Sequence, residues 1–433
     1  MCIEMHVYAW DGRYREEMSH LSSDRLVCAL TVLAMGACTT FGGADGADAP
    51  DADSGVSEPT DGQVLRDGAG DAEARDVGAD GSVACRPPRA ALDATFDWEA
   101  PVTNAVAALA PDGAVLVVGR ASCGDSGRQM ALFRVVAASA PVMLGCFGDD
   151  LELAVGIDVD ATGIAIASHY AATGYLGARL RRLSLSGQVR EPLVQQASPT
   201  GSVLPTAVRR VAGRDVWAFY AAPSSGIPEG SIRVEGGAGR TTSVGPNAVM
   251  AFGGVGASLD SLLVPIPPTD PPLNEISVSR RTLVGDTLVA DANFGPAGKI
   301  VIGATSPNPI QYNGASLYVS QDAMVVGIPQ QATATARFLK TAPPKLEHTV
   351  GPVGAGVGQV AVTMTCDGSV VLGHAAGQKG RLSRFGAPET SPTADPTWGL
   401  DLPRPPKALL TRANDVFVVF EDAGKTRIVR LDR

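Results

Sequence analysis

The sequence predicts an all-β fold, a seven-bladed β-propeller built from four-stranded blades. The first observation is an arginine that recurs inside short apolar segments, 46 to 57 residues apart along the chain. The second is a turn followed by an apolar run ahead of each arginine. A repeat period of about 40 to 50 residues is typical of propellers and solenoids. The seven arginines are Arg134, Arg182, Arg233, Arg280, Arg337, Arg384 and Arg430.

The first 37 residues are predicted to be a signal segment for export. Residues 26–37 are uncharged and mostly apolar, which suits a secretory signal and is too short to span a bilayer. A buried helix over the same residues is the alternative. Four acidic residues within 1–17 do not suit the positively charged start of a signal. We therefore expect translation to begin at Met18.

The segment Met35-Gly-Ala-Cys38 resembles the bacterial lipobox, although that motif usually has Leu where Met35 stands. The resemblance implies that Cys38 is the lipidation site and that lipid anchors the chain to a membrane. Thr39, the residue after the cysteine, resembles the pattern of outer-membrane sorting. The expected location is the outer membrane or the cell surface.

Residues 38–85 are predicted to be a disordered tether. The stretch 39–84 is rich in Asp, Ala and Gly and has eleven acidic residues against two arginines. Such a composition cannot bury enough apolar surface to offset chain entropy. Asp51 and Asp53 have the spacing of two calcium ligands, but the other positions of a calcium loop are missing.

Residues 86–433 are predicted to form the propeller. In the first repeat, Asn104-Ala-Val leads to the turn Pro111-Asp-Gly113 and then to an apolar run. Such turns between apolar runs predict β-hairpins. The seven apolar runs, which we expect to be second strands, are 115–118, 164–166, 216–219, 262–264, 324–326, 370–372 and 416–419. The arginine segments then become the third strands.

A third repeated motif is Asp-x-(Thr/Asn)-aromatic, at 93–96, 291–294 and 395–398. The three motifs together resemble the bacterial delta-60 repeat over roughly 89–433, best over 91–136 and 359–399. The resemblance implies a β-propeller and carries no established catalytic residues. The last repeat lacks its fourth strand, so we expect residues 92–96 to supply it and to close the ring.

Four cysteines remain beyond the lipidation site, an even number that suits export. They allow three pairings, of which we favour Cys123–Cys146, within one repeat, together with Cys85–Cys366. No Cys-x-x-Cys spacing occurs, which speaks against zinc or redox chemistry. The recurring arginines are expected to pair with acids or backbone carbonyls between blades.

No catalytic, phosphate-binding or dinucleotide-binding motif occurs, so we predict neither a cofactor nor a metal. Residues 85–433 hold 29 acidic against 30 basic residues, which provides no basic surplus for nucleic acid. Polar residues at the starts of first strands and the ends of second strands are expected to ring the mouth of the central channel. They are Asn104, Glu152, Thr206, Asn247, Gln359, Lys407, Arg120, His169 and His374.

Two functions fit these features. The first is a non-enzymatic, monomeric scaffold that binds an extracellular protein or glycan at the channel mouth. The alternative is an extracellular lyase or hydrolase acting on glycans or esters. An enzyme needs an acid–base pair, and the nearest candidates are Glu152 and His169.

Overall fold

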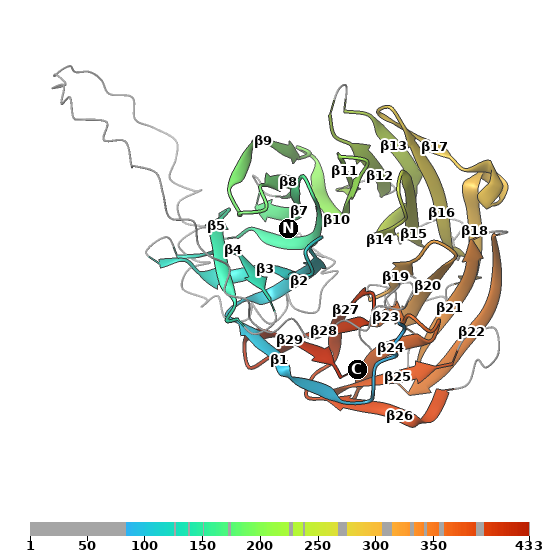
Figure 1. Ribbon diagram of the computed structural model, residues 1–433. Coiled ribbons are helices and arrows are strands. Elements are labelled where there is room, and N and C mark those ends of the chain that lie inside the picture. Colours follow the sequence, from blue (N-terminus) through green and yellow to red (C-terminus); the bar gives the residue numbers. More distant parts are fainter. Residues whose placement is uncertain are drawn as a thin grey trace, which may run out of the picture. The chain divides into compact units, whose positions relative to one another are not determined.

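Seven antiparallel sheets make up the unit from Cys85 to Arg433, as the sequence predicts (Figure 1). The computed structural model describes residues 84–124, 127–136, 139–149, 151–171, 175–224, 228–236, 239–266, 275–304, 314–329, 333–341, 344–354, 359–386 and 394–432. The predicted signal segment, nearly all of the tether and Cys38 lie outside these residues. None of the described helices is long and apolar enough to cross a membrane.

The first three blades follow one another along the chain, and each has four strands. Blade 1 contains β2 (Thr103–Leu109), β3 (Val115–Ser122), β4 (Arg128–Val135) and β5 (Val142–Phe147). Blade 2 contains β6 (Leu153–Asp160), β7 (Gly163–Ala171), β8 (Leu176–Leu183) and β9 (Val189–Gln196). Blade 3 contains β10 (Gly201–Val211), β11 (Arg214–Pro223), β12 (Glu229–Val234) and β13 (Thr241–Gly245).

Blade 4 differs at its outer edge, where two short strands share the fourth position. It contains β14 (Asn247–Gly253), β15 (Ser258–Pro265), β16 (Glu275–Val284), β17 (Thr287–Ala290) and β18 (Lys299–Ala304). Both β17 and β18 pair with β16, and between them lie the 3-10 helices η2 (Ala292–Phe294) and η3 (Pro296–Gly298). The Asp-x-Asn-Phe motif of this blade therefore forms a helical turn instead of a continuous strand.

The last three blades complete the ring. Blade 5 contains β19 (Ser316–Val319), β20 (Ala323–Pro329), β21 (Thr333–Thr341) and β22 (Pro344–Gly354). Blade 6 contains β23 (Ala361–Met364), β24 (Val370–Ala376), β25 (Lys379–Phe385) and β26 (Ala394–Leu402). Blade 7 contains β27 (Pro406–Arg412), β28 (Asp415–Asp422), β29 (Lys425–Leu431) and β1 (Leu92–Ala100). Each first strand contacts the next around the ring, and β27 contacts β2.

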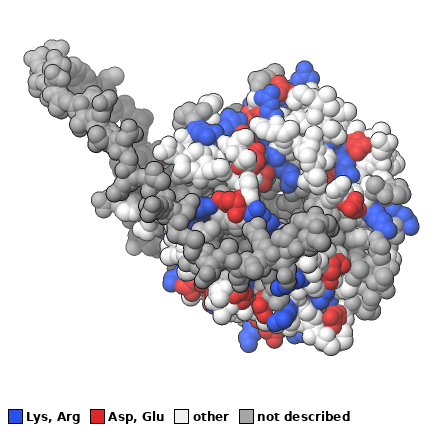
Figure 2. Space-filling view, viewed as in Figure 1, with Lys and Arg blue, Asp and Glu red and all other residues white. Residues whose placement is uncertain are grey.

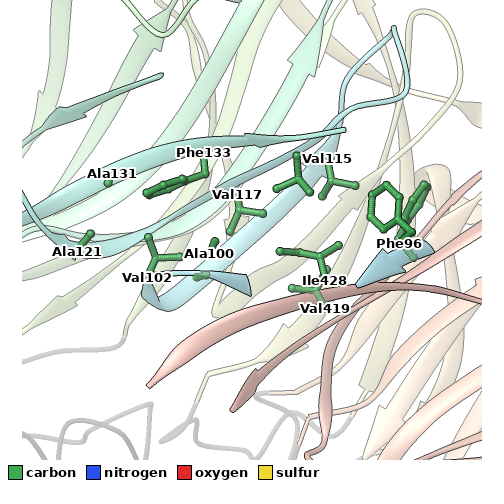
Figure 3. Packing of buried hydrophobic residues seen from close by; sticks show 13 residues of the cluster. Phe96, Ala100, Val102, Val115, Val117, Ala121, Ala131, Phe133, Val419 and Ile428 are labelled. Carbon is green, nitrogen blue, oxygen red and sulfur yellow. The ribbon is translucent and has the colours of Figure 1, made fainter. Parts of the chain in front are cut away.

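The N-terminal strand β1 closes blade 7, as predicted. It runs antiparallel to β29, with Leu92 opposite Leu431 and Ala100 opposite Thr426. Phe96 of β1 is 2% exposed and lies in a core cluster with residues of blades 1 and 7 (Figure 3). The closing strand therefore joins the two ends of the described chain in one apolar core.

Apolar clusters fill the space between neighbouring blades all around the ring. In the second strand β3, Val115 and Val117 pack towards blade 7, while Leu116 and Val118 pack towards blade 2. Successive side chains of a strand point to opposite faces, so a strand with a blade on each side must be apolar at every position. This burial on both faces explains the uninterrupted apolar runs in the sequence.

The Asp-x-Thr-aromatic motif forms a tight local turn that buries its ring. Asp93 accepts hydrogen bonds from the backbone nitrogen and the hydroxyl of Thr95, at 2.8 and 2.7 Å. Asp395 accepts the same two bonds from Thr397, at 2.9 and 2.6 Å. Such turns kink the strand, and the pairing register shifts between Leu92 and Asp97.

The seven recurring arginines all lie in third strands, and six of them pair with an acidic residue. The prediction that these pairs run between blades is wrong for five of the six. Arg280 pairs with Asp260 of the same sheet at 2.7 Å, and among the described residues only Arg182 reaches the next blade, at Asp215. The other acidic partners are Asp112, Glu235, Asp367 and Asp93, whereas Arg337 donates to the hydroxyl of Thr349. A third strand is paired with the second and fourth strands of its own blade. The acidic residue nearest to its arginine is therefore usually one that belongs to the same blade.

Both favoured disulfides are present. Cys123–Cys146 joins the end of β3 to β5, and Cys85–Cys366 spans 281 residues of sequence. The second bond fastens the segment before β1 to blade 6. Trp398 of that blade also donates from its indole nitrogen to the carbonyl of Pro88, at 3.0 Å. The start of the unit is thereby held against blades 6 and 7.

Candidate binding site on the top face

First strands begin and second strands end on the same side of the propeller, which we call the top face. In blade 1, Arg120 near the end of β3 lies opposite Thr103 at the start of β2. In blade 2, His169 near the end of β7 lies opposite Leu153 at the start of β6. The antiparallel register thus places the predicted polar residues at one edge of the sheets. Burial separates them into several groups.

Glu152 and His374 do not form part of an exposed rim. Their side chains are buried, with Glu152 0% and His374 2% exposed. Burial lowers the pKa of His374, so its imidazole stays neutral at physiological pH. These two side chains are therefore not available as open ligand groups at the channel mouth, because the surrounding protein covers them.

Glu152 is the centre of a buried charge network at the start of blade 2. Its carboxylate accepts hydrogen bonds from the hydroxyl of Ser168 at 2.6 Å and from Nη1 of Arg179 at 2.8 Å. Arg181 donates from Nε and Nη2, at 2.8 and 2.7 Å. Burial by itself would raise the pKa of Glu152, but the bonds from Arg181 and Ser168 outweigh it and lower the pKa.

This network also determines what Glu152 can do chemically. A carboxylate that accepts four strong hydrogen bonds and has a lowered pKa is a weak base and a poor proton donor near neutral pH. The predicted acid–base pair of Glu152 and His169 therefore lacks the property that catalysis would require of the carboxyl group. The residues of the network that the sequence reasoning missed are Arg179 and Arg181, which lie in the middle of the third strand β8.

The same network fixes the connection that leads from blade 1 to blade 2. The backbone nitrogen of Glu152 donates to the carbonyl of Asp149 at 2.9 Å, which closes a turn. Arg179 also pairs with Asp149 at 2.6 Å, and its guanidinium lies 3.8 Å from the ring centroid of Tyr170. Within this turn, Leu151 is 60% exposed and the side chain of Asp149 is 68% exposed. A buried anchor thus holds an exposed apolar residue beside an exposed acid.

A second group of polar residues links blades 6, 7 and 1. Lys407 of β27 pairs with Glu421 of β28, and Glu421 accepts a hydrogen bond from the backbone nitrogen of Ala105 in blade 1, at 3.2 Å. Gln359 donates from its side-chain nitrogen to the carbonyl of Lys407, at 2.8 Å. Glu421 was not among the residues predicted from the sequence. Glu421 follows the apolar run Val416–Phe420, as His169 follows the apolar run of its own repeat. This equivalent position would have identified it.

The three remaining predicted residues are spread over other first strands. Asn247 begins β14 and donates to the carbonyl of Val244 at 3.0 Å, so its amide serves the link between blades 3 and 4. Asn104 adopts a left-handed backbone conformation, with φ of 51°. Thr206 lies within β10 and is half-buried. The predicted ring is therefore a set of local contacts between blades, and no single site gathers all nine residues.

Charge is mixed on the surface of the propeller. Figure 2 shows acidic and basic side chains interspersed on the face in view, with no extended area of one sign. In the described part of the chain, no three His, Cys, Asp or Glu side chains lie close enough together to hold a metal ion. The surface thus suits local contacts of mixed character more than the electrostatic attraction of a polyanion.

Solved propellers resemble this unit in fold. No protein-family model matches the chain, and no curated protein sequence matches it. The WD40 domain of Toxoplasma gondii coronin has a TM-score of 0.46 and 9% identity over 81% of this chain and 89% of that one. The WD40 propeller of Doa1 has a TM-score of 0.46 and 11% identity, over 79% and 96%. The Dos1 propeller has a TM-score of 0.45 and 9% identity, over 73% and 76%.

Proposed function

We propose that this chain is an exported, lipid-anchored β-propeller that binds a protein partner on its top face without catalysis. The anchor would be Cys38, within the lipobox-like segment, at the outer membrane or the cell surface. Two disulfides support export, because such bonds persist in oxidising compartments and are rare in the cytosol. Residues after Cys38 would serve as a tether between the membrane and the propeller.

The observation that carries the binding proposal is the pinned turn between blades 1 and 2. An exposed leucine on a free loop would lose conformational entropy on binding. Here the buried Glu152 network already holds Leu151 and Asp149 in place. An exposed apolar side chain that is already held in one place can enter the apolar core of an interface at a low entropic cost.

Chemistry favours a protein over a glycan as the partner. Sugar rings are commonly recognised by stacking on exposed aromatic faces. The exposed large apolar side chains in the described residues are Val, Leu and Met, with no aromatic ring among them. The enzymatic alternative is weaker, because the low pKa of Glu152 disfavours acid–base chemistry there.

Binding is tested with the full chain and a Leu151→Asp variant on cell-envelope extracts, using quantitative mass spectrometry of cross-linked partners. Asp401→Ala is the matched control, because Asp401 is an exposed acid of blade 6 whose side chain is 72% exposed. We expect one partner to be lost at least tenfold with Leu151→Asp and kept with Asp401→Ala. Equal recovery of every partner with the full chain and both variants would refute the top-face site. Binding of the full chain to a glycan array would show that the partner is a glycan and would refute a protein partner.

The anchor is tested separately. Cys38→Ser should abolish metabolic labelling with a fatty acid and release the protein from the membrane fraction, while the binding of the purified protein stays unchanged. Membrane association of Cys38→Ser equal to that of the unchanged chain would refute the anchor without affecting the binding proposal.

A further inference from the structure

A polar cluster lies in the apolar interface between blades 3 and 4. In β15, Leu259 and Leu263 pack against blade 3. Because side chains alternate along a strand, Ser261 between them points to the same face. In β16, Leu283 packs against blade 3, and the same alternation directs Arg281, Ser279 and Ser277 to that face. Three serines and one arginine therefore point into the space that faces blade 3.

The strand register brings these groups together. Ser261 lies directly opposite Ser279 in the β15–β16 pair, and residues opposite each other have Cβ atoms about 5 Å apart. Nη1 of Arg281 donates to the hydroxyl of Ser279 at 2.8 Å. The guanidinium thus folds back along the strand over the serine pair. Ser277 lies two residues further along β16 on the same face, opposite Leu263.

Arg281 has no acidic partner in the described part of the chain. Its neighbour Arg280, on the other face of β16, forms two bonds with Asp260, at 2.7 and 3.1 Å. Burial lowers the pKa of Arg281, and no carboxylate offsets that effect. A partly buried charge without a counter-charge is unfavourable, so a negative partner at this position would stabilise the protein.

Two of the serine hydroxyls lack a partner as well. Ser261 and Ser277 are each 0% exposed, and neither hydroxyl oxygen has a hydrogen-bond partner among the described residues. Buried polar groups in native proteins are nearly always hydrogen-bonded. Each hydroxyl can donate a proton, so the cluster offers several donors and a positive charge. One bound anion would satisfy all of them.

We propose that the interface of blades 3 and 4 binds a small oxyanion, a carboxylate or a phosphate group, between Arg281 and the hydroxyls of Ser261, Ser277 and Ser279. The planar guanidinium suits the paired oxygens of such a group. Water would satisfy the hydroxyls but would leave the charge of Arg281 uncompensated. Arg281 lies near the end of β16 and is only partly buried. An anion would therefore enter the site past Arg281, from the face opposite the top face. Tyr220 of blade 3, on the same strand face as Val216 and Ala218, forms part of the facing wall.

The test is thermal unfolding of the full chain while chloride is replaced by phosphate, or by acetate, at constant ionic strength. We expect a saturable rise in Tm with at least one of these anions, and the two arms distinguish the phosphate from the carboxylate. Arg281→Met should abolish the rise. Ser261→Ala should weaken the apparent affinity by about tenfold, since a hydrogen bond to a charged group is lost.

Arg381→Met is the matched control, because the Arg381 side chain is 49% exposed on blade 6. It should keep the full response. A rise in Tm that does not saturate, or that is equal in Arg281→Met, would overturn the proposal, since it would reflect a general salt effect. If Arg281→Met does not fold, Ser261→Ala decides, and an unchanged anion affinity in that folded variant overturns the site. Serine-to-alanine changes that raise stability with no dependence on the anion would do so as well.

Discussion

Closure of the ring by β1 can be tested at a single side chain. Phe96 is 2% exposed, its ring lies 5.0 Å from that of Phe417 in an edge-on arrangement, and the guanidinium of Arg430 lies 5.6 Å from its centroid. Truncating a buried phenylalanine to alanine destabilises a protein by about 3–5 kcal/mol. An aromatic pair adds about 0.5–1.5 kcal/mol. We therefore expect Phe96→Ala to lower the free energy of unfolding by about 3.5–6.5 kcal/mol.

The assay is urea unfolding of the full chain, followed by circular dichroism and by tryptophan fluorescence. Phe294→Ala is the matched control, because Phe294 is 1% exposed and lies under Arg280 at 4.5 Å, in a blade built from consecutive chain. Similar losses in both variants would support a closing strand that packs like an internal one. A loss below about 1 kcal/mol in Phe96→Ala, with a full loss in Phe294→Ala, would refute the reasoning.

Three further outcomes are expected. Glu152→Gln should lower the free energy of unfolding by about 3–5 kcal/mol in urea, because it leaves buried guanidinium groups without their carboxylate; a loss below 1 kcal/mol would contradict this role. Burial would raise the pKa of Asp93, but hydrogen bonds from its threonine and arginine neighbours lower it, so its stabilisation is present above the unfolded pKa of about 3.9 and is lost as pH falls through the folded pKa. Asp93→Asn should therefore flatten the acid side of a stability–pH profile, and an unchanged profile would count against it. Cys85→Ser should destabilise more than Cys123→Ser, since chain-entropy estimates for loops of 281 and 23 residues are about 5.6 and 3.4 kcal/mol; equal midpoints in urea under oxidising conditions would contradict that order.

Much of the architecture could be predicted because it depends on local pattern. The arginine period, the apolar runs and the Asp-x-Thr-aromatic motif each indicate one strand of a blade. Each motif is a weak indication in a single copy, and its repetition along the chain strengthens the prediction. The closing strand was predictable because residues 92–96 carry the motif that the last repeat lacks. The split outer edge of blade 4 was not, since Asp291 and Phe294 match the motif but lead into a helical turn.

The site was harder to predict because burial depends on neighbouring blades. Glu152 and His169 both lie at the same end of blade 2 in the sequence pattern, but only the folded sheet of that blade brings Arg179 and Arg181 of β8 onto Glu152. These contacts make a predicted catalytic acid into an anchor for the turn that presents Leu151.

By itself, the sequence predicted the number of blades, the order of strands and the strand that closes the ring, and it favoured the disulfide pairing that the structure contains. These follow from period, alternation and cysteine count, which are properties of one strand or one pair of strands. Only the tertiary structure decided which polar side chains are buried, which arginines have an acid within reach, and where Arg281 and its serines meet. The physical reason is that burial and side-chain contacts depend on how paired strands and neighbouring blades pack together, and the pattern of a single strand does not record that packing.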